Sequence, residues 1–145
     1  MKFGLNKIRA VFGDKQSMKQ TQVENQIDDI IKSIDEEAFA ISEQNVLFGR
    51  TSELGGYYYA ITIIVGSFKI KTNKGAKLVL KGHNFDLTLN SDMDEFESNH
   101  SNASKRHITR IDFQIEKKDV AKFDKKKITS LTLSVKKQEV VFKTL

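Results

Sequence analysis

The chain has no cysteine and no proline. Without cysteine it can form no disulfide, hold no metal through thiolates and use no thiol nucleophile. Without proline its folding includes no slow X-Pro isomerisation. Cysteine-free proteins occur in reducing and oxidising compartments alike, so this absence does not assign a location.

Long apolar runs are also missing. The longest, residues 57–66, is about half of the ~20 residues that a membrane-spanning helix needs. Near the N-terminus, Lys7 and Arg9 interrupt the apolar core that a secretory signal requires. We therefore expect a cytoplasmic protein without a transmembrane segment.

The residues that are present are typical of a soluble globular protein, with 39% hydrophobic and 30% charged residues. A chain of 145 residues fits one domain, and a domain of this size buries roughly 68–70% of its unfolded surface. We expect a single domain over 1–145 that folds without disulfides or a bound metal.

The net charge of +5 is unevenly distributed along the chain. Residues 1–19 carry +4, residues 20–45 carry −6 and residues 46–145 carry +7. An acidic block between basic segments suits a protein-binding surface or a nucleic-acid binder. Lysine outnumbers arginine twenty to four, whereas specific recognition of phosphates and bases favours arginine. We interpret the lysine excess as a bias of the whole composition rather than as a site.

Two helices are expected in the first forty residues. Residues 2–13 form a short basic amphipathic pattern, which suits a membrane-surface anchor or, as we favour, a terminal helix packed on its own domain. A polar linker over 14–20 follows. The main helix is predicted over 21–40, because Thr21 and Glu24 form a capping box and apolar residues then recur at helical spacing.

The back of this predicted helix is acidic. Its carboxylates lie mostly off the apolar stripe, so we expect them to face solvent. Three of them are candidate contact residues for a partner: Asp28, Asp35 and Glu36.

From residue 45 the apolar period changes to two, which predicts strands. In residues 57–70 the alternation slips by one at Gly66, which predicts one long strand bent at a β-bulge. Tyr57 and Tyr59 share the apolar set of that strand and are expected in the core. The other strands are predicted over 45–50, 77–81, 85–89, 110–116, 128–135 and 140–142, with a helical turn over 117–124. Turns are expected at 53–56, 72–75, 82–83 and 136–137.

These elements predict an α+β fold. Short connections favour antiparallel neighbours, and an antiparallel sheet of six to seven strands over 45–145 must bury one face. We expect the 21–40 helix to cover that face. Two architectures satisfy this requirement: a sheet curled around the helix, and a small β-sandwich with the helix at one end.

Residues 91–107, SDMDEFESNHSNASKRH, hold six candidate ligands for a cation within seventeen residues: Asp92, Asp94, Glu95, Glu97, His100 and His107. Counted from Asp92, the glycine and glutamate of a calcium loop are replaced by Glu97 and Ala103. His100 and His107 are seven residues apart, too far for one ion unless the chain folds back. We therefore interpret 91–106 as a long solvated connection, a binding loop or flap.

No phosphate-binding glycine loop, no GxSxG elbow and no pair of nucleophile and base is present, and no cofactor is expected. An enzyme is possible but unsupported. We expect a non-catalytic binding or assembly module that contacts a protein partner or a second copy of itself. The candidate surfaces are the acidic helix, an exposed sheet edge and the 91–106 loop with Asp92, Asp94 and Glu97.

Two alternatives remain. The first is electrostatic binding of nucleic acid through the lysines Lys125, Lys126 and Lys127. The second is a small-molecule carrier or enzyme with a pocket between the sheet and the helix.

Overall fold

The structure is a computed structural model that describes residues 27–32, 34, 36–101 and 105–145. Of these residues 60% lie in strands and 11% are helical. The strands are β1 (Ala38–Ile41), β2 (Asn45–Leu54), β3 (Tyr57–Gly66), β4 (Lys71–Thr72), β5 (Lys77–Gly82), β6 (Asp86–Ser91), β7 (Phe96–Glu97), β8 (Asn99–Ser101), β9 (Arg106–Ile115), β10 (Ile128–Val135) and β11 (Gln138–Thr144). A 3₁₀ helix, η1 (Lys117–Lys122), separates β9 from β10.

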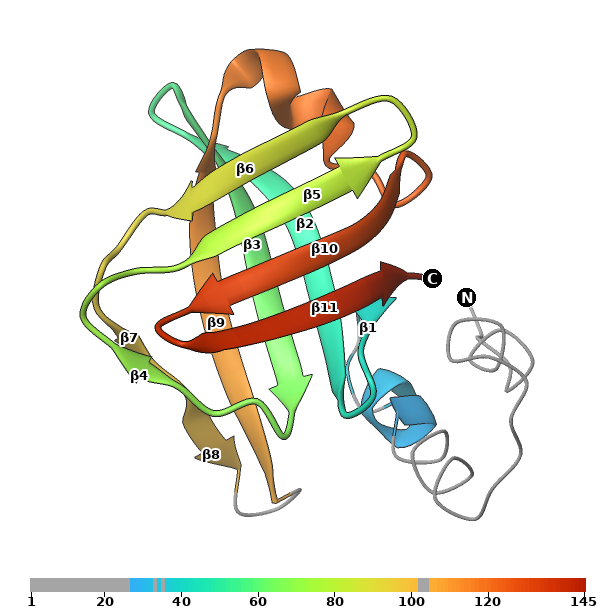
Figure 1. Ribbon diagram of the computed structural model, residues 1–145, viewed down its shortest axis with the longest axis vertical. Helices are drawn as coiled ribbons and strands as arrows, with labels where there is room; N and C mark the ends of the chain where they lie inside the picture. The colour runs from blue at the N-terminus through green and yellow to red at the C-terminus, as the bar shows by residue number, and fades with distance from the viewer. Residues whose placement is uncertain (1–26, 33, 35, 102–104) are drawn as a thin grey trace.

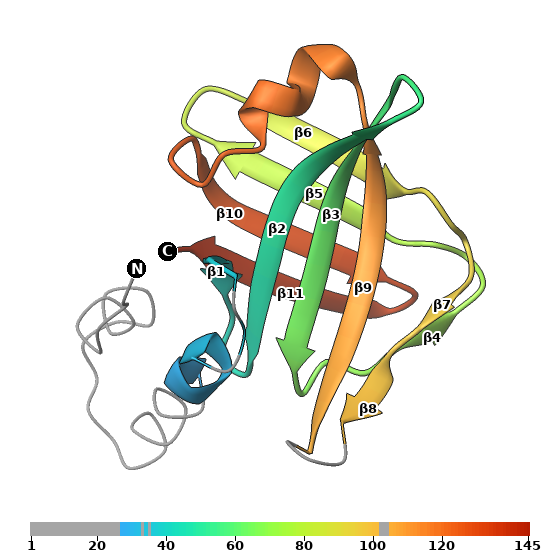
Figure 2. The ribbon, with the colours of Figure 1, turned by 180° about the vertical axis from the view of Figure 1, so that it is seen from behind.

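Eight strands form a sheet that closes on itself. Their order is β3-β2-β1-β11-β10-β5-β6-β9, and β9 pairs again with β3, while β8 extends the open side of β9. All pairings are antiparallel. Figures 1 and 2 show two layers whose strands cross, with β5, β6, β10 and β11 on one side and β2, β3 and β9 on the other.

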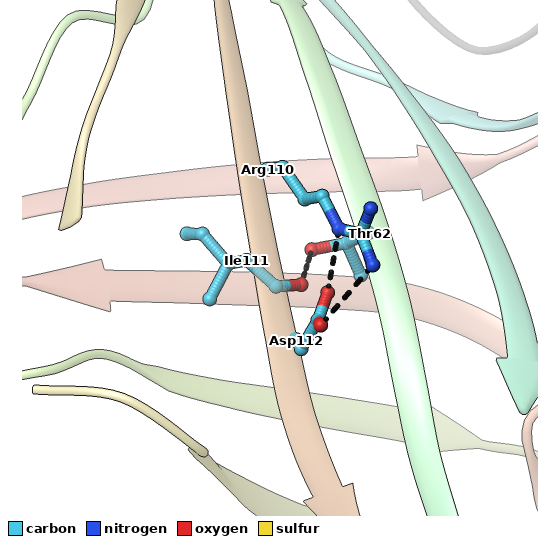
Figure 3. Close-up of polar contacts among 4 residues, drawn as sticks. All are labelled: Thr62, Arg110, Ile111 and Asp112. Atoms are coloured by element: carbon cyan, nitrogen blue, oxygen red, sulfur yellow. Dashed lines mark hydrogen bonds and ion pairs between the residues drawn. The ribbon is translucent and has the colours of Figure 1, made fainter. Parts of the chain in front are cut away.

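The sheet closes at the seam where β3 pairs with β9. Their register runs from Tyr58 opposite Ile115 to Gly66 opposite His107. The buried hydroxyl of Thr62 donates a hydrogen bond of 2.7 Å to the carbonyl of Ile111, as Figure 3 shows. The seam is therefore joined by a side chain as well as by the backbone ladder.

The interior of the closed sheet is filled by side chains of the strands. Apolar residues from both layers form one cluster, and each fully buried side chain of this size stabilises the fold by roughly 1.5–3 kcal/mol. The cluster includes Leu47, Ile64, Leu78, Leu80, Phe113, Leu131 and Phe142, all at most 1% exposed.

A second apolar cluster lies on the outer face of β1, β2 and β3. The helix over 27–32 places Ile27 and Ile30 against Val46, Phe48 and Val65, and all five are buried. Figure 1 shows the described part of this helix beside β1 and the adjoining end of β2. No helix in the described part of the chain has the length and apolar character to cross a membrane.

The predicted α+β fold is wrong. The chain is mostly β, and the helix neither fills a curled sheet nor caps a sandwich but packs outside a closed sheet. The helix predicted over 21–40 also extends too far, because residues 38–41 form β1. These four residues, AFAI, are all buried between β2 and β11, and a strand buried on both faces lacks the alternation that separates it from a helix.

The long bent strand predicted over 57–70 is also wrong, because β3 ends at Gly66 and residues 67–70 leave the sheet. Gly66 has a φ of 152°, and a Cβ there would lie 2.0 Å from the carbonyl oxygen of Gln44. The even residues of β3 face the interior of the closed sheet, so Tyr57 and Tyr59 lie on the outer face. Tyr57 is 71% exposed and Tyr59 is half-buried, and neither belongs to the core, contrary to the prediction.

Several local predictions are confirmed. The turn between β2 and β3 is the two-residue loop Gly55-Gly56, with φ values of 60° and 86° that suit a tight hairpin. Lys136, with φ 53°, begins the equally short turn between β10 and β11. The turn at 72–75 does not form a hairpin, because β4 pairs with β7. The helix predicted over 2–13, the linker over 14–20 and the capping box lie outside the described residues.

Candidate binding groove

The predicted acidic surface is only partly described. Asp28 forms an ion pair with Lys32, one turn along the helix, with 2.8 Å between the carboxylate oxygen and the ammonium nitrogen. The hydrogen bond to Asp28, reinforced by its charge, raises the pKa of Lys32 above its ordinary value. Glu36 is exposed just after the helix, and Asp35 lies outside the described residues.

The predicted lysine cluster is partly used by the fold. Lys125 pairs with Glu37 and donates to the carbonyl of Ala38, while Lys127 donates to the carbonyl of Ala121 at 3.1 Å. Lys126 is exposed, and its backbone N–H binds Asp124. The cluster borders a hollow of about 770 Å³ beside Phe39 and Phe123.

The described part of the 91–106 connection, residues 91–101 and 105–106, is not a plain solvated loop. It contains β7 and β8, and Phe96 packs against the interior cluster. Asp92 is exposed, and its carboxylate accepts a hydrogen bond of 2.9 Å from the side-chain amide of Gln114. The backbone carbonyl of Asp94 accepts a hydrogen bond from the backbone N–H of Gly75. Glu97 lies in β7 opposite Lys71.

The structure therefore places the described members of the predicted contact set at three separate places. The helix carboxylates lie outside β1 to β3, the 92–97 carboxylates lie beside β6, β9 and β4, and the lysines follow η1. One contact joins two of these regions, because Glu37, next to Glu36, pairs with Lys125.

A groove that the sequence does not reveal lies where β6 and β9 separate. The two strands pair only at Asn90–Gln114 and Ser91–Phe113. Beyond this point β9 ends at Ile115 and the chain turns into η1, so β6 loses its neighbour. The resulting groove has a volume of about 580 Å³ and is bordered by β6, the start of β3 and the start of η1.

One side of the groove is a strand edge. The backbone N–H of Ser91 points to the β5 side and donates a hydrogen bond to the carbonyl of Ala76. The backbone N–H of the next residue, Asp92, points to the β9 side and donates to the carbonyl of Asp112. Because backbone groups alternate direction along a strand, the N–H and C=O of Thr88 point to the β9 side. Among the described residues no strand pairs with Thr88 on that side, so its backbone groups face the groove.

The opposite side of the groove carries three consecutive tyrosines. Tyr57 and Tyr59 lie on the outer face of β3, and Tyr58 packs partly into the interior cluster. The Gly55-Gly56 turn carries the start of β3 beyond the closed sheet, which leaves Tyr57 exposed. Asp119 in η1 also borders the groove, but it is buried and bound to Lys122 at 2.8 Å.

Other parts of the surface offer different chemistry. Lys74, Lys136 and Lys137 border a basic hollow of about 590 Å³ at the turn between β10 and β11. A smaller hollow of about 190 Å³ lies beside Asp92, Arg110 and Asp112. Arg110 and Asp112 pair on the outer face of β9 (Figure 3), and this hydrogen bond, with the charge of Asp112, raises the pKa of Arg110.

The contact between helix and sheet, where one alternative function placed a pocket, is filled by buried isoleucine, valine and phenylalanine. Within residues 27–32, 36–101 and 105–145, no group of three or more histidine, aspartate or glutamate side chains is arranged to hold a metal. Comparison with protein-family models, curated proteins and solved structures finds no match.

Proposed function

We propose that this protein is a non-catalytic binding module that takes up an extended segment of a partner protein in the groove beside β6. The observation that supports this proposal is the open edge at Thr88. A strand edge offers a backbone donor and acceptor in the spacing that another extended chain matches. A polypeptide satisfies both groups, whereas a compact ligand of similar size does not reproduce that spacing.

The tyrosines supply the second element of recognition. Aromatic side chains with a polar tip are enriched at protein interfaces because they bury a large area with little loss of conformational freedom. In our proposal the partner segment hydrogen-bonds to Thr88 and lays its side chains against Tyr57 and Tyr59. A cytoplasmic location remains part of this proposal.

The test uses the full chain and a displayed library of short random peptides. Peptides selected on the unmodified protein are then measured against Thr88→Pro and Thr88→Ala. Proline removes the groove-facing N–H, and strand edges tolerate it because the β5 ladder does not use that group. Alanine keeps the N–H and is the matched control. We expect Thr88→Pro to weaken binding about tenfold or more, because a lost hydrogen bond costs on the order of 1–1.5 kcal/mol.

Equal binding of the selected peptides to both variants would overturn the proposal. Unfolding by denaturant, measured in parallel, distinguishes a lost contact from a lost fold. Amide exchange of Thr88 with and without peptide gives a direct readout, because a paired amide exchanges more slowly.

Two other functions stay predictions and are tested alongside. Light scattering during size-exclusion chromatography reports self-association. A labelled DNA duplex at low salt tests the lysines, since electrostatic binding would weaken steeply as salt is added. Lys126→Ala is the informative variant there, because Lys125 and Lys127 also hold the fold.

A further inference from the structure

The hairpin formed by β8 and β9 brings two histidines together. His100 lies directly opposite His107 in the register, and their ring centroids are 5.0 Å apart with planes inclined by 59°. Opposite residues of an antiparallel pair project from the same face. The backbone N–H of Lys105 donates a hydrogen bond of 2.7 Å to the carbonyl of Ser101, and this bond joins the end of β8 to the residue before β9.

We infer that His100 and His107 form a two-histidine site for a divalent transition-metal ion, with Zn²⁺ as the reference case. Imidazole nitrogen suits Zn²⁺, Cu²⁺ and Ni²⁺. Two imidazoles on one tetrahedral Zn²⁺, bound through ~2.0–2.1 Å bonds, have ring centroids about 5 Å apart. The observed centroid separation of 5.0 Å is close to that value.

The strand that carries His107 is paired on both sides, whereas β8, which carries His100, is paired with β9 alone. His107 lies opposite Gly66 of β3 on one edge and opposite His100 on the other. Just before β8, the Ser98 hydroxyl forms a hydrogen bond of 2.6 Å with the Thr109 hydroxyl. The same hydroxyl accepts a hydrogen bond of 2.9 Å from the backbone N–H of Ile70. A ligand pair on a fixed ladder loses less conformational entropy on binding than one on a free loop.

The site is accessible and incomplete. His100 is exposed and His107 half-buried, so an ion reaches both from solvent. The two imidazoles supply two of four tetrahedral positions, and water or an external ligand takes the others. The basic neighbours Lys105 and Arg106 oppose a cation, so we expect weaker binding than in a structural zinc site with four protein ligands.

Isothermal titration of the full chain with ZnCl₂ at neutral pH tests the inference. The unmodified protein should bind one Zn²⁺, and His100→Ala and His107→Ala should each weaken binding at least about tenfold. The double variant should lose little more than either single variant, because a single imidazole does not chelate. His83→Ala is the matched control, since His83 lies in the turn between β5 and β6 and should leave the affinity unchanged.

Imidazole ¹⁵N chemical shifts provide a second readout that does not depend on affinity. On adding Zn²⁺, the nitrogens of His100 and His107 should shift together while those of His83 stay in place. His100→Gln, at an exposed position, keeps the fold testable if an alanine variant proves unstable. Absence of zinc binding by the unmodified protein, or an equal loss in His83→Ala, would overturn the inference.

Discussion

Phe39 and Phe123 stack with ring centroids 4.9 Å apart and planes inclined by 27°. Phe39 belongs to β1, whereas Phe123 follows η1, so the stack joins the first strand of the sheet to the segment that crosses its end. Gly49 of β2 makes room for it. A Cβ at Gly49 would lie 3.0 Å from Phe123 and 3.5 Å from Phe39, so the Phe123 ring would have to shift by a few tenths of an ångström to admit a methyl group.

Gly49→Ala should therefore destabilise the fold by about 1 kcal/mol, at the low end of the usual cost of overpacking, because the ring borders a hollow into which it can shift. Chemical denaturation measures the loss. Phe123→Leu in the same chain should recover part of it, because the smaller side chain vacates the contested space. An additive double variant would show that the two residues do not compete.

Gly66→Ala should be more damaging than any other glycine substitution discussed here. The new Cβ would meet backbone at 2.0 Å in a conformation that L-residues rarely adopt, so we expect a loss of about 3 kcal/mol or more. Gly55→Ala is the control, because it also has a positive φ but nothing within 4 Å. Its cost should be about 1–2 kcal/mol. Similar losses in both would mean that backbone angle, not contact, sets the cost at Gly66.

Phe48→Ala tests the outer apolar cluster. Phe48 is 1% exposed although it lies on the outer face of the sheet, so its truncation should cost about 3–5 kcal/mol, as for an interior phenylalanine. Val141→Ala, at a side chain that is 47% exposed, should cost less than ~1 kcal/mol. If Phe48→Ala were as mild as Val141→Ala, the 27–32 helix would not cover this face in solution.

Thr62→Val probes the seam between β3 and β9. The change keeps the shape and removes the hydrogen bond to Ile111, which should cost about 1–2 kcal/mol because the site is buried. Thr129→Val removes a similar bond, to the carbonyl of Lys81, at an exposed position and should cost less. Thermal denaturation of both variants makes the comparison, and equal losses would contradict a special role for the seam.

Asp28→Asn should lower the pKa of Lys32 toward its ordinary value, since Asp28 supplies the hydrogen bond and most of the charge that raise it. A cation whose folded pKa is raised stabilises the fold below its unfolded pKa. That contribution disappears as pH rises through the folded pKa, so the pair matters only below strongly alkaline pH. NMR titration of the Lys32 ammonium in both proteins measures the change, and identical curves would exclude the pairing.

The local patterns of the second half of the chain were predictable because one face of each strand is polar. Leu78 and Leu80 alternate with lysines, and Leu131, Leu133 and Val135 alternate with threonine and serine, so strand and buried face both follow. The tight turns follow equally well from Gly55-Gly56 and Lys136-Lys137.

In the first half of the chain the pattern did not identify the inner face of the strands, because odd-numbered and even-numbered residues are both apolar. In β3 the even residues Ala60 and Ile64 face the interior, whereas Ile63 and Val65 lie under the helix cluster. Alternation cannot identify the inner face of such a strand. The closing pair β3–β9 joins residues far apart in sequence, and nothing local in either strand specifies that partnership.

The groove and the histidine pair were hidden for the same reason. Each depends on where two strands pair: the groove on the point at which β9 leaves β6, and the pair on the β8–β9 hairpin that sets His100 opposite His107. Glu116 and Lys117, where the chain passes from β9 into η1, are the only local sign that β9 stops short of Thr88.

The position of β1 in the closed sheet has a consequence for synthesis on the ribosome. Its neighbours are β2 and β11, with Ala40 opposite Thr144 and Ile41 opposite Lys143. After β2 has been made and before β11 follows, the apolar strand AFAI has one edge without its partner. Such an edge is a template for pairing with other extended chains until β11 has emerged and the ring can close.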